Sequence, residues 1–134
     1  MNIFNARRGI LATVVAGVSM WILAGFWHNL VLPLVHPNAA AHHEGLLIGL
    51  LAYVILAAIM TYLFVTSRWP QRTVVRGLVL GAVVGVLWVF PHGLAMAGVH
   101  GTSIGYEVRN ALYHVFEQGI GGVVVACVVT TPKP

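Results

Sequence analysis

The chain has 134 residues, of which 59% are hydrophobic and only 7% are charged, and its mean hydropathy is +0.90. Soluble domains carry about 45–50% apolar and about 25% charged residues, so the composition excludes an ordinary soluble domain and indicates a membrane protein. Seven Lys and Arg against three acidic residues give a formal net charge of +4. Because the basic residues flank apolar runs, they are typical of headgroup contact and predict no nucleic-acid binding.

Four apolar runs are each long enough to cross a bilayer, which takes roughly 20 residues of helix. They cover about residues 9–35, 45–66, 74–98 and 106–130, with short connections between them. We therefore predict an all-α polytopic membrane protein, a single domain of four transmembrane helices in an antiparallel bundle. Its simplest arrangement is two tandem helical hairpins.

Charge placement predicts the orientation of these spans. If the spans alternate, all but one of the basic residues fall on one side of the membrane: Arg7, Arg8, Arg68, Arg72, Arg76 and Lys133. The positive-inside rule then places both termini in the cytoplasm, with the arginines of the inner connection facing anionic headgroups. The first apolar run, about 26 residues long, exceeds the roughly 7–15 of a signal peptide, so we expect it to be retained.

The first span ends in a segment that is repeated at the end of the third. Residues 26–36 read FWHNLVLPLVH and residues 90–100 read FPHGLAMAGVH, with five identities in eleven positions. Two of the identities pair histidines, His28 with His92 and His36 with His100. A tandem hairpin duplication would place both copies at the same face of the membrane.

The third span carries Gly77, Gly81 and Gly85, a small-xxx-small pattern that lets helix backbones approach closely in lipid. We predict that this span is the most central helix and that Pro91 kinks it. The second span has little polar content and is expected to contact the most lipid.

The fourth span has a polar stripe, because polar and small residues recur at spacings of three and four and so share one helix face: Tyr106, Asn110, His114, Glu117 and Gly121. Glu117 would lie near the middle of the bilayer. A charge there costs about 2.5–3.5 kcal/mol on insertion scales, so intramembrane carboxylates are functional candidates by default.

All seven histidines fall in the half of the molecule away from the termini. Imidazole with a carboxylate companion is a common ligand set for Zn, Cu and Ni, so we predict a transition-metal site of His28, His92, His114 and Glu117. Asn110 and Arg109 would lie around this site. An outer site that collects the metal would consist of His36, His42, His43, Glu44 and His100.

Several alternatives stay open. His28 and His92 would also suit axial ligation of haem b, and Glu117 would suit transport of a small cation or proton. A cofactor-free accessory subunit could instead use Gly77, Gly81 and Gly85 to pack in a homo-oligomer or a larger membrane complex. Interhelical hydrogen bonding alone would explain some buried polar residues. No catalytic motif is present, so the sequence does not indicate an enzyme.

In layout the chain resembles small four-helix bacterial inner-membrane protein families of unknown function. The stretches that carry the resemblance are GFWHN in the first span, GLVLGAVVGVLWVFPHG in the third and YEVRNALYHVFEQGIGG at the start of the fourth. The resemblance implies the four-helix fold and a bacterial inner-membrane location. It implies no activity.

Overall fold

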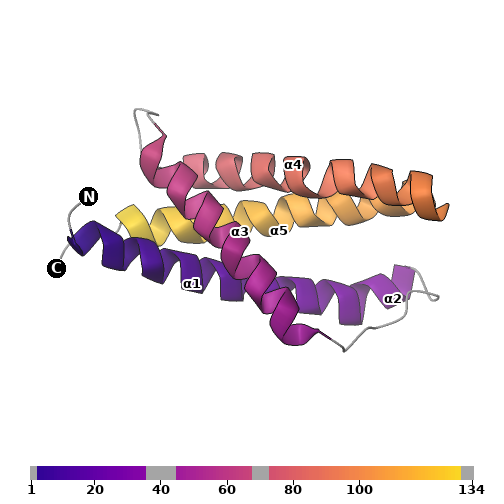
Figure 1. The fold of residues 1–134 in the computed structure, drawn as a ribbon, viewed down its shortest axis with the longest axis horizontal. Coiled ribbons are helices and arrows are strands. Elements are labelled where there is room, and N and C mark those ends of the chain that lie inside the picture. The colour runs from indigo at the N-terminus through magenta and orange to yellow at the C-terminus, as the bar shows by residue number, and fades with distance from the viewer. Residues whose placement is uncertain (1–2, 36–44, 68–72, 131–134) are drawn as a thin grey trace.

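The structure, a computed structural model, describes residues 3–35, 45–67 and 73–130 (Figure 1). Its elements are α1 (Ile3–Phe26), the π-helix η1 (Trp27–Val31), α2 (Leu32–Val35), α3 (Leu46–Thr66), α4 (Val74–His100) and α5 (Ile104–Thr130). Four stretches of helix are long and apolar enough to cross a membrane: Ala6–Leu34, Leu46–Thr66, Val74–His100 and Ile104–Thr130. The predicted all-α fold with four membrane-spanning helices is confirmed, and each predicted boundary lies within three residues of the observed one.

The long helices form two hairpins. α1 packs against α3, and α4 packs against α5 along most of its length, while α5 also contacts α1. Figure 1 shows that α1, α4 and α5 follow the long axis of the molecule and that α3 crosses them obliquely. Both chain ends lie at the same end of the bundle (Figure 1). The most buried span is α5 and not α4, so the prediction that the third span is central was wrong: α5 is the helix on which the other three meet.

Glycines allow α4 and α5 to touch backbone to backbone. A Cβ added at Gly81 would overlap the carbonyl oxygen of Gln118, and one added at Gly77 would overlap that of Gly122. Small residues at a helix interface in lipid permit this close approach of the backbones. The contact buries Gly77, Gly81 and Gly85. They are therefore not available to a partner protein, which corrects the idea that an accessory subunit would dock through them.

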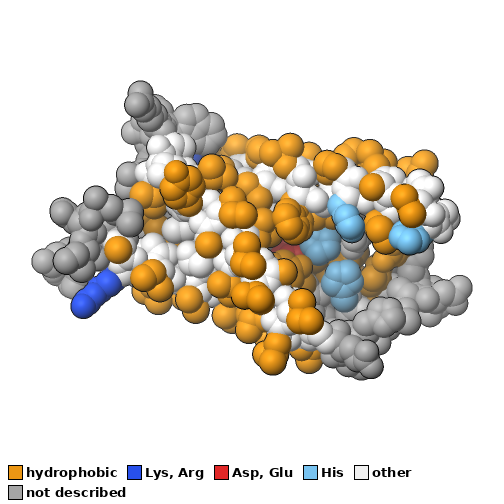
Figure 2. All heavy atoms as spheres, viewed as in Figure 1, with side chains coloured by type: hydrophobic (Ala, Val, Ile, Leu, Met, Phe, Trp, Pro, Cys, Tyr) orange, Lys and Arg blue, Asp and Glu red, His pale blue; other side chains and the backbone are white. Residues whose placement is uncertain are grey.

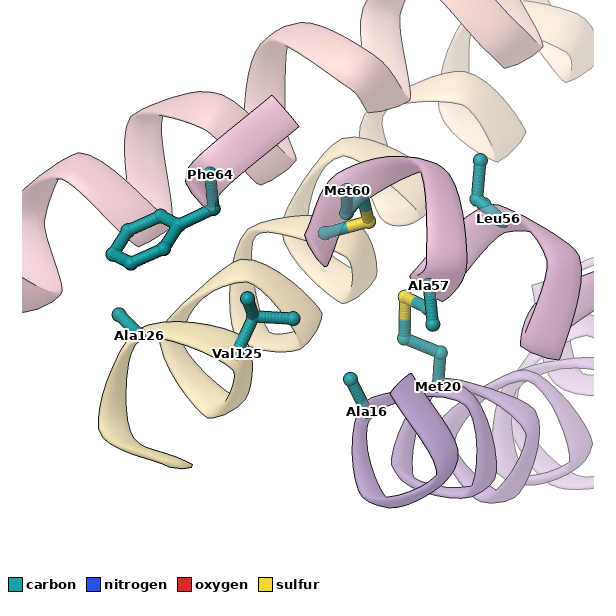
Figure 3. Packing of buried hydrophobic residues seen from close by; sticks show 8 residues of the cluster. All are labelled: Ala16, Met20, Leu56, Ala57, Met60, Phe64, Val125 and Ala126. Carbon is teal, nitrogen blue, oxygen red and sulfur yellow. The ribbon is translucent and has the colours of Figure 1, made fainter. Parts of the chain in front are cut away.

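The core lies where α1, α3 and α5 cross (Figure 3). It contains only apolar side chains, contributed by all three helices: Ala16, Met20, Leu56, Ala57, Met60, Phe64, Val125 and Ala126. Where α1 and α5 cross, a Cβ added at Gly121 would overlap the side chain of Met20. Packing is therefore close at the level where the polar stripe of α5 ends.

Arg76 ties the end of α3 to the start of α4. It is 4% exposed, and its Nη2 donates to the carbonyl oxygens of Phe64 at 2.9 Å and Ser67 at 3.0 Å, and to the Ser67 hydroxyl. Carbonyls at a helix C-terminus lack partners within the helix, so a buried guanidinium satisfies them. The arginines of the inner connection that were expected to face lipid headgroups, Arg68 and Arg72, lie outside the described residues.

The two repeated segments differ in local structure. Residues 27–35 form the π-helix η1 followed by the short α2, whereas residues 90–100 continue α4 as an α-helix through Pro91. The similarity of residues 26–36 and 90–100 is therefore not matched by a similar backbone. A turn at Gly101, which has a left-handed φ of 67°, then leads into α5.

Candidate functional site

A buried pair of ionisable side chains lies in the first half of α5. His114 Nδ1 is 2.7 Å from Glu117 Oε2, and the two residues are three positions apart on one helix face. His114 is 9% exposed and Glu117 is fully buried. Burying a charge is costly unless it is paired and hydrogen-bonded, so this pair is the most demanding polar feature of the described bundle.

The pair is incompletely satisfied by the surrounding helices. Across from α5, the Tyr53 hydroxyl of α3 donates to Glu117 Oε2 at 3.5 Å, which is a long contact. Glu117 Oε1 and Gln118 Oε1 are both buried and have no hydrogen-bond partner among the described residues. Buried polar atoms in folded proteins nearly always have partners. These two oxygens are therefore acceptors to which a bound molecule could donate hydrogen bonds.

The π-helix η1 places His28 beside this pair. The rings of His28 and His114 have centroids 5.7 Å apart and are tilted by 41°. The neighbouring Trp27 holds the segment, because its ring stacks on Tyr113 at 4.2 Å and its Nε1 donates to Asn110 Oδ1 at 3.3 Å. π-Helices are rare, and the single π-helical turns that occur inside α-helices often lie at functional sites.

A cavity of about 240 Å³ opens beside His114. α3 and α4 form its two sides and α5 forms its floor, with these residues lining it: Gly49, Ala52, Tyr53, Leu56, Trp88, Val89, His92, Asn110, His114 and Gln118. Figure 2 shows histidine side chains gathered around a hollow on one face, with an acidic side chain partly visible beside them. Asn110 and His114 of the polar stripe, together with Gln118, thus form the floor of a recess in the bundle, and Glu117 lies behind His114 outside the lining.

The structure brings together part of the predicted metal site. His28, His114 and Glu117 are neighbours, and His92 lines the same cavity as His114. However, the described residues contain no group of three or more His, Cys, Asp or Glu that could hold a metal ion. Glu117 is bonded to His114 instead of lying open beside it. In this geometry Glu117 orients a histidine, and the four side chains do not form a ligand set.

The other predicted residues have separate positions. Asn110 lines the cavity and accepts the Trp27 hydrogen bond. Arg109 is exposed near the start of α5, and His100 is exposed at the last position of α4. The remaining members of the predicted outer site lie outside the described residues: His36, His42, His43 and Glu44.

Sequence reasoning missed Tyr53, Trp88 and Gln118 as members of the site. Gln118 directly follows Glu117 in the sequence, so it could have been considered as a second buried polar group. Tyr53 and Trp88 carried no such signal, because an aromatic residue within an apolar span has the same pattern whether it faces lipid or a cavity. Comparison with protein families, curated proteins and solved structures finds no match for this chain. The resemblance in layout to bacterial inner-membrane families stays a prediction.

Proposed function

We propose that this protein binds a small cation inside the membrane, with Glu117 as the charge that the cation neutralises. The observation that supports the proposal is the burial of Glu117 with only one of its oxygens hydrogen-bonded. A neutral His114 can donate from Nδ1 to the ionised carboxylate and leave the pair with one net negative charge. Intramembrane carboxylates of this kind typically mark ion or substrate pathways and proton relays.

No described basic residue supplies the missing positive charge at this level of the bundle. Arg76 bonds the end of α3 near Phe64 and Ser67. Arg109 lies eight residues before Glu117 on α5, which is about 12 Å along a helix. A bound cation or a proton is therefore the simplest partner for Glu117, and the transport alternative from the sequence belongs to this proposal.

Labelling of the purified protein in detergent with dicyclohexylcarbodiimide tests the proposal, because this reagent attacks protonated carboxyls in apolar surroundings. By intact-protein mass spectrometry, we expect one reagent molecule to be attached per chain. This addition should be lost in Glu117→Gln and kept in the matched control Glu107→Gln. Trimethylammonium, which cannot form an amide with the activated carboxyl, is expected to slow the labelling, as are Na⁺ or K⁺ if they bind. If none of these cations slows it, the cation-binding proposal is wrong.

A transition metal is the second candidate, supported by the contact between His28 and His114. Their ring centroids, 5.7 Å apart, are close enough for both rings to reach one ion through bonds of about 2 Å. A hydrogen bond from the other ring nitrogen to a carboxylate is the usual setting of a metal-bound histidine, and Glu117 supplies one. His92 is the nearest further imidazole on the cavity wall. The haem b alternative gains no support, because a porphyrin is larger than a cavity of about 240 Å³.

Equilibrium dialysis against Zn²⁺, Cu²⁺ or Ni²⁺, followed by elemental analysis, separates the two candidates. Metal binding at the candidate site should fall in His28→Ala and in His114→Ala but not in His100→Ala, which removes an exposed histidine at the end of α4. Equal binding by all four proteins would contradict the metal candidate and leave the cation proposal unaffected.

We also propose that the end of the bundle with both chain termini faces the cytoplasm of a bacterial inner membrane. Arg7 and Arg8 lie at this end of α1, whereas Arg109 lies near the other end of the bundle. Basic residues concentrate on the cytoplasmic side. Reporter fusions to the C-terminus, active only in the cytoplasm or only outside it, would test the orientation.

A further inference from the structure

The cavity beside His114 has its mouth on the side of the bundle. No residue of α1 lines it, so its two walls are α3 and α4, which have little direct contact with each other. Along these walls Ala52, Trp88 and His92 are exposed, whereas His114 and Gln118 on the floor are buried. The recess therefore opens through the gap between the two hairpins.

This mouth lies within the membrane-spanning part of both helices. His92 is eight residues from the end of α4 at His100, and Ala52 is six residues from the start of α3 at Leu46. At 1.5 Å per residue these positions are about 12 Å and about 9 Å from the helix ends. The hydrocarbon core of a bilayer is about 30 Å thick, so the mouth faces acyl chains and not bulk water.

The polar groups around the mouth define what they would bind. His92 is exposed there and makes no hydrogen bond within the described part of the chain. Behind it, Gln118 is 1% exposed, and its Oε1 is an acceptor without a partner. Two aromatic side chains, Tyr53 and Trp88, stand on opposite walls. Acceptors together with aromatic rings favour a cation that carries N–H donors.

We infer that the ligand is a lipid-soluble amine, that is, a protonated amino group on an apolar chain, which enters from the bilayer between α3 and α4. The amino head occupies the recess, where Gln118 Oε1 accepts an N–H. Glu117 does not line the recess, but it is bonded to His114, which does, and it supplies the opposite charge from there. Tyr53 and Trp88 flank the head, and the apolar chain leaves through the mouth into the acyl chains. This inference rests on the proposed cation site and names the class and route of its ligand.

Native mass spectrometry of the protein released from detergent tests the inference with four probes: decylamine, decanol, methylammonium and decyltrimethylammonium. Decylamine has both the charge and the tail and should bind most tightly. Decanol lacks the charge, methylammonium lacks the tail, and decyltrimethylammonium lacks N–H donors. Each should bind about tenfold more weakly or worse, since each lacks one of the recognised features.

Variants of the mouth and the floor complete the test. Ala52→Trp, or the milder Ala52→Leu, fills the mouth without touching the buried pair and should weaken decylamine binding by about tenfold or more. Leu51→Trp is the matched control, because Leu51 is exposed on the same turn of α3 but does not line the cavity. Gln118→Leu should weaken decylamine binding and leave the binding of decyltrimethylammonium unchanged, because that probe has no donor for Gln118 Oε1. Circular dichroism establishes that each variant keeps its helices.

The outcomes separate this inference from the proposed function. If methylammonium binds as tightly as decylamine and Ala52→Trp has no effect, the lateral route is wrong, while cation protection of Glu117 against the carbodiimide can still be observed. If decanol binds as well as decylamine, the amine is not recognised and the ligand class is wrong. If Glu117 is labelled at the same rate with and without every cation, both proposals fail.

Discussion

His114 Nδ1 and Glu117 Oε2 lie 2.7 Å apart on the same face of α5, inside a span that is otherwise largely apolar. Glu117 could not be placed there alone at low cost, because an unpaired buried charge is strongly unfavourable. The contact also fixes the roles of the two imidazole nitrogens: Nδ1 faces the carboxylate and Nε2 is left for a ligand. The pair therefore links the stability of the bundle to the chemistry of the cavity.

Removing His114 alone should destabilise the protein more than removing both members of the pair. His114→Leu leaves Glu117 buried without its main partner and should cost about 3–5 kcal/mol, the range for breaking a buried pair. Glu117→Leu should cost less, because a neutral imidazole at the edge of a cavity can find a partner. The double variant should be more stable than the sum of the single effects predicts.

Equilibrium unfolding in mixed micelles, followed by circular dichroism, measures all four corners of this cycle. Additive effects would mean that the two side chains are not coupled and would remove the basis for treating them as a unit. Tyr53→Phe serves as a control, since it deletes only the 3.5 Å contact to Glu117 and should change stability by less than either member of the pair.

The spans could be predicted from sequence because a bilayer permits little else: backbone groups in hydrocarbon must bond within their own segment, so a long apolar run becomes a helix. The contact of His114 with Glu117 follows from their spacing on one helix. Contacts between helices were harder to predict. The glycines of α4 indicated close packing, but their pattern does not say that the partner is α5 of the same chain.

The position of His28 could not be predicted from a regular helix. In η1 the helix widens at Trp27, and this local change brings the His28 ring next to His114. WHNLV itself contains no proline or glycine, and the nearest signal is Pro33, which has no N–H to donate to the Asn29 carbonyl four residues earlier. The four residues predicted to bind a metal lie around one cavity, but Glu117 is bonded to His114, and the described residues contain no group of three or more possible ligands.

A methyl group in the contact between α4 and α5 should force the helices apart. Gly81→Ala places a Cβ against the Gln118 carbonyl, which is backbone and cannot rotate away. We expect a loss of about 1–3 kcal/mol, as for other overpacked sites. Gly98→Ala is the matched control in the same helix, because a Cβ there meets nothing within 4 Å. If both variants unfold at the same denaturant concentration, the close approach at Gly81 does not contribute to stability.

Arg76 should tolerate neither loss nor conservative replacement. Arg76→Met removes charge-assisted hydrogen bonds to the end of α3, each worth about 1.5–3 kcal/mol, and the stacking of the guanidinium over the Phe64 ring, 4.8 Å from its centroid. Arg76→Lys keeps the charge but not the planar guanidinium that stacks over the Phe64 ring. In thermal unfolding, both variants should have a midpoint temperature well below that of Arg7→Met, a control at an exposed site. An Arg76→Lys protein as stable as the wild type would contradict the role given to the stacked guanidinium.

Trp27 should determine whether His28 stays beside His114, because Trp27 joins η1 to α5 through two different contacts. Trp27→Phe keeps a ring to stack on Tyr113 and loses only the donor to Asn110, at a cost of about 0.5–1.5 kcal/mol. Trp27→Leu loses the stacking as well, which adds about 0.5–1.5 kcal/mol, and should release η1 from α5. Nuclear magnetic resonance of labelled histidine rings distinguishes the two: the signals of His28 and His114 should be nearly unchanged in Trp27→Phe and should shift in Trp27→Leu. Unchanged signals in both variants would mean that η1 keeps its shape without Trp27, and that the His28 position is determined by the helix backbone itself.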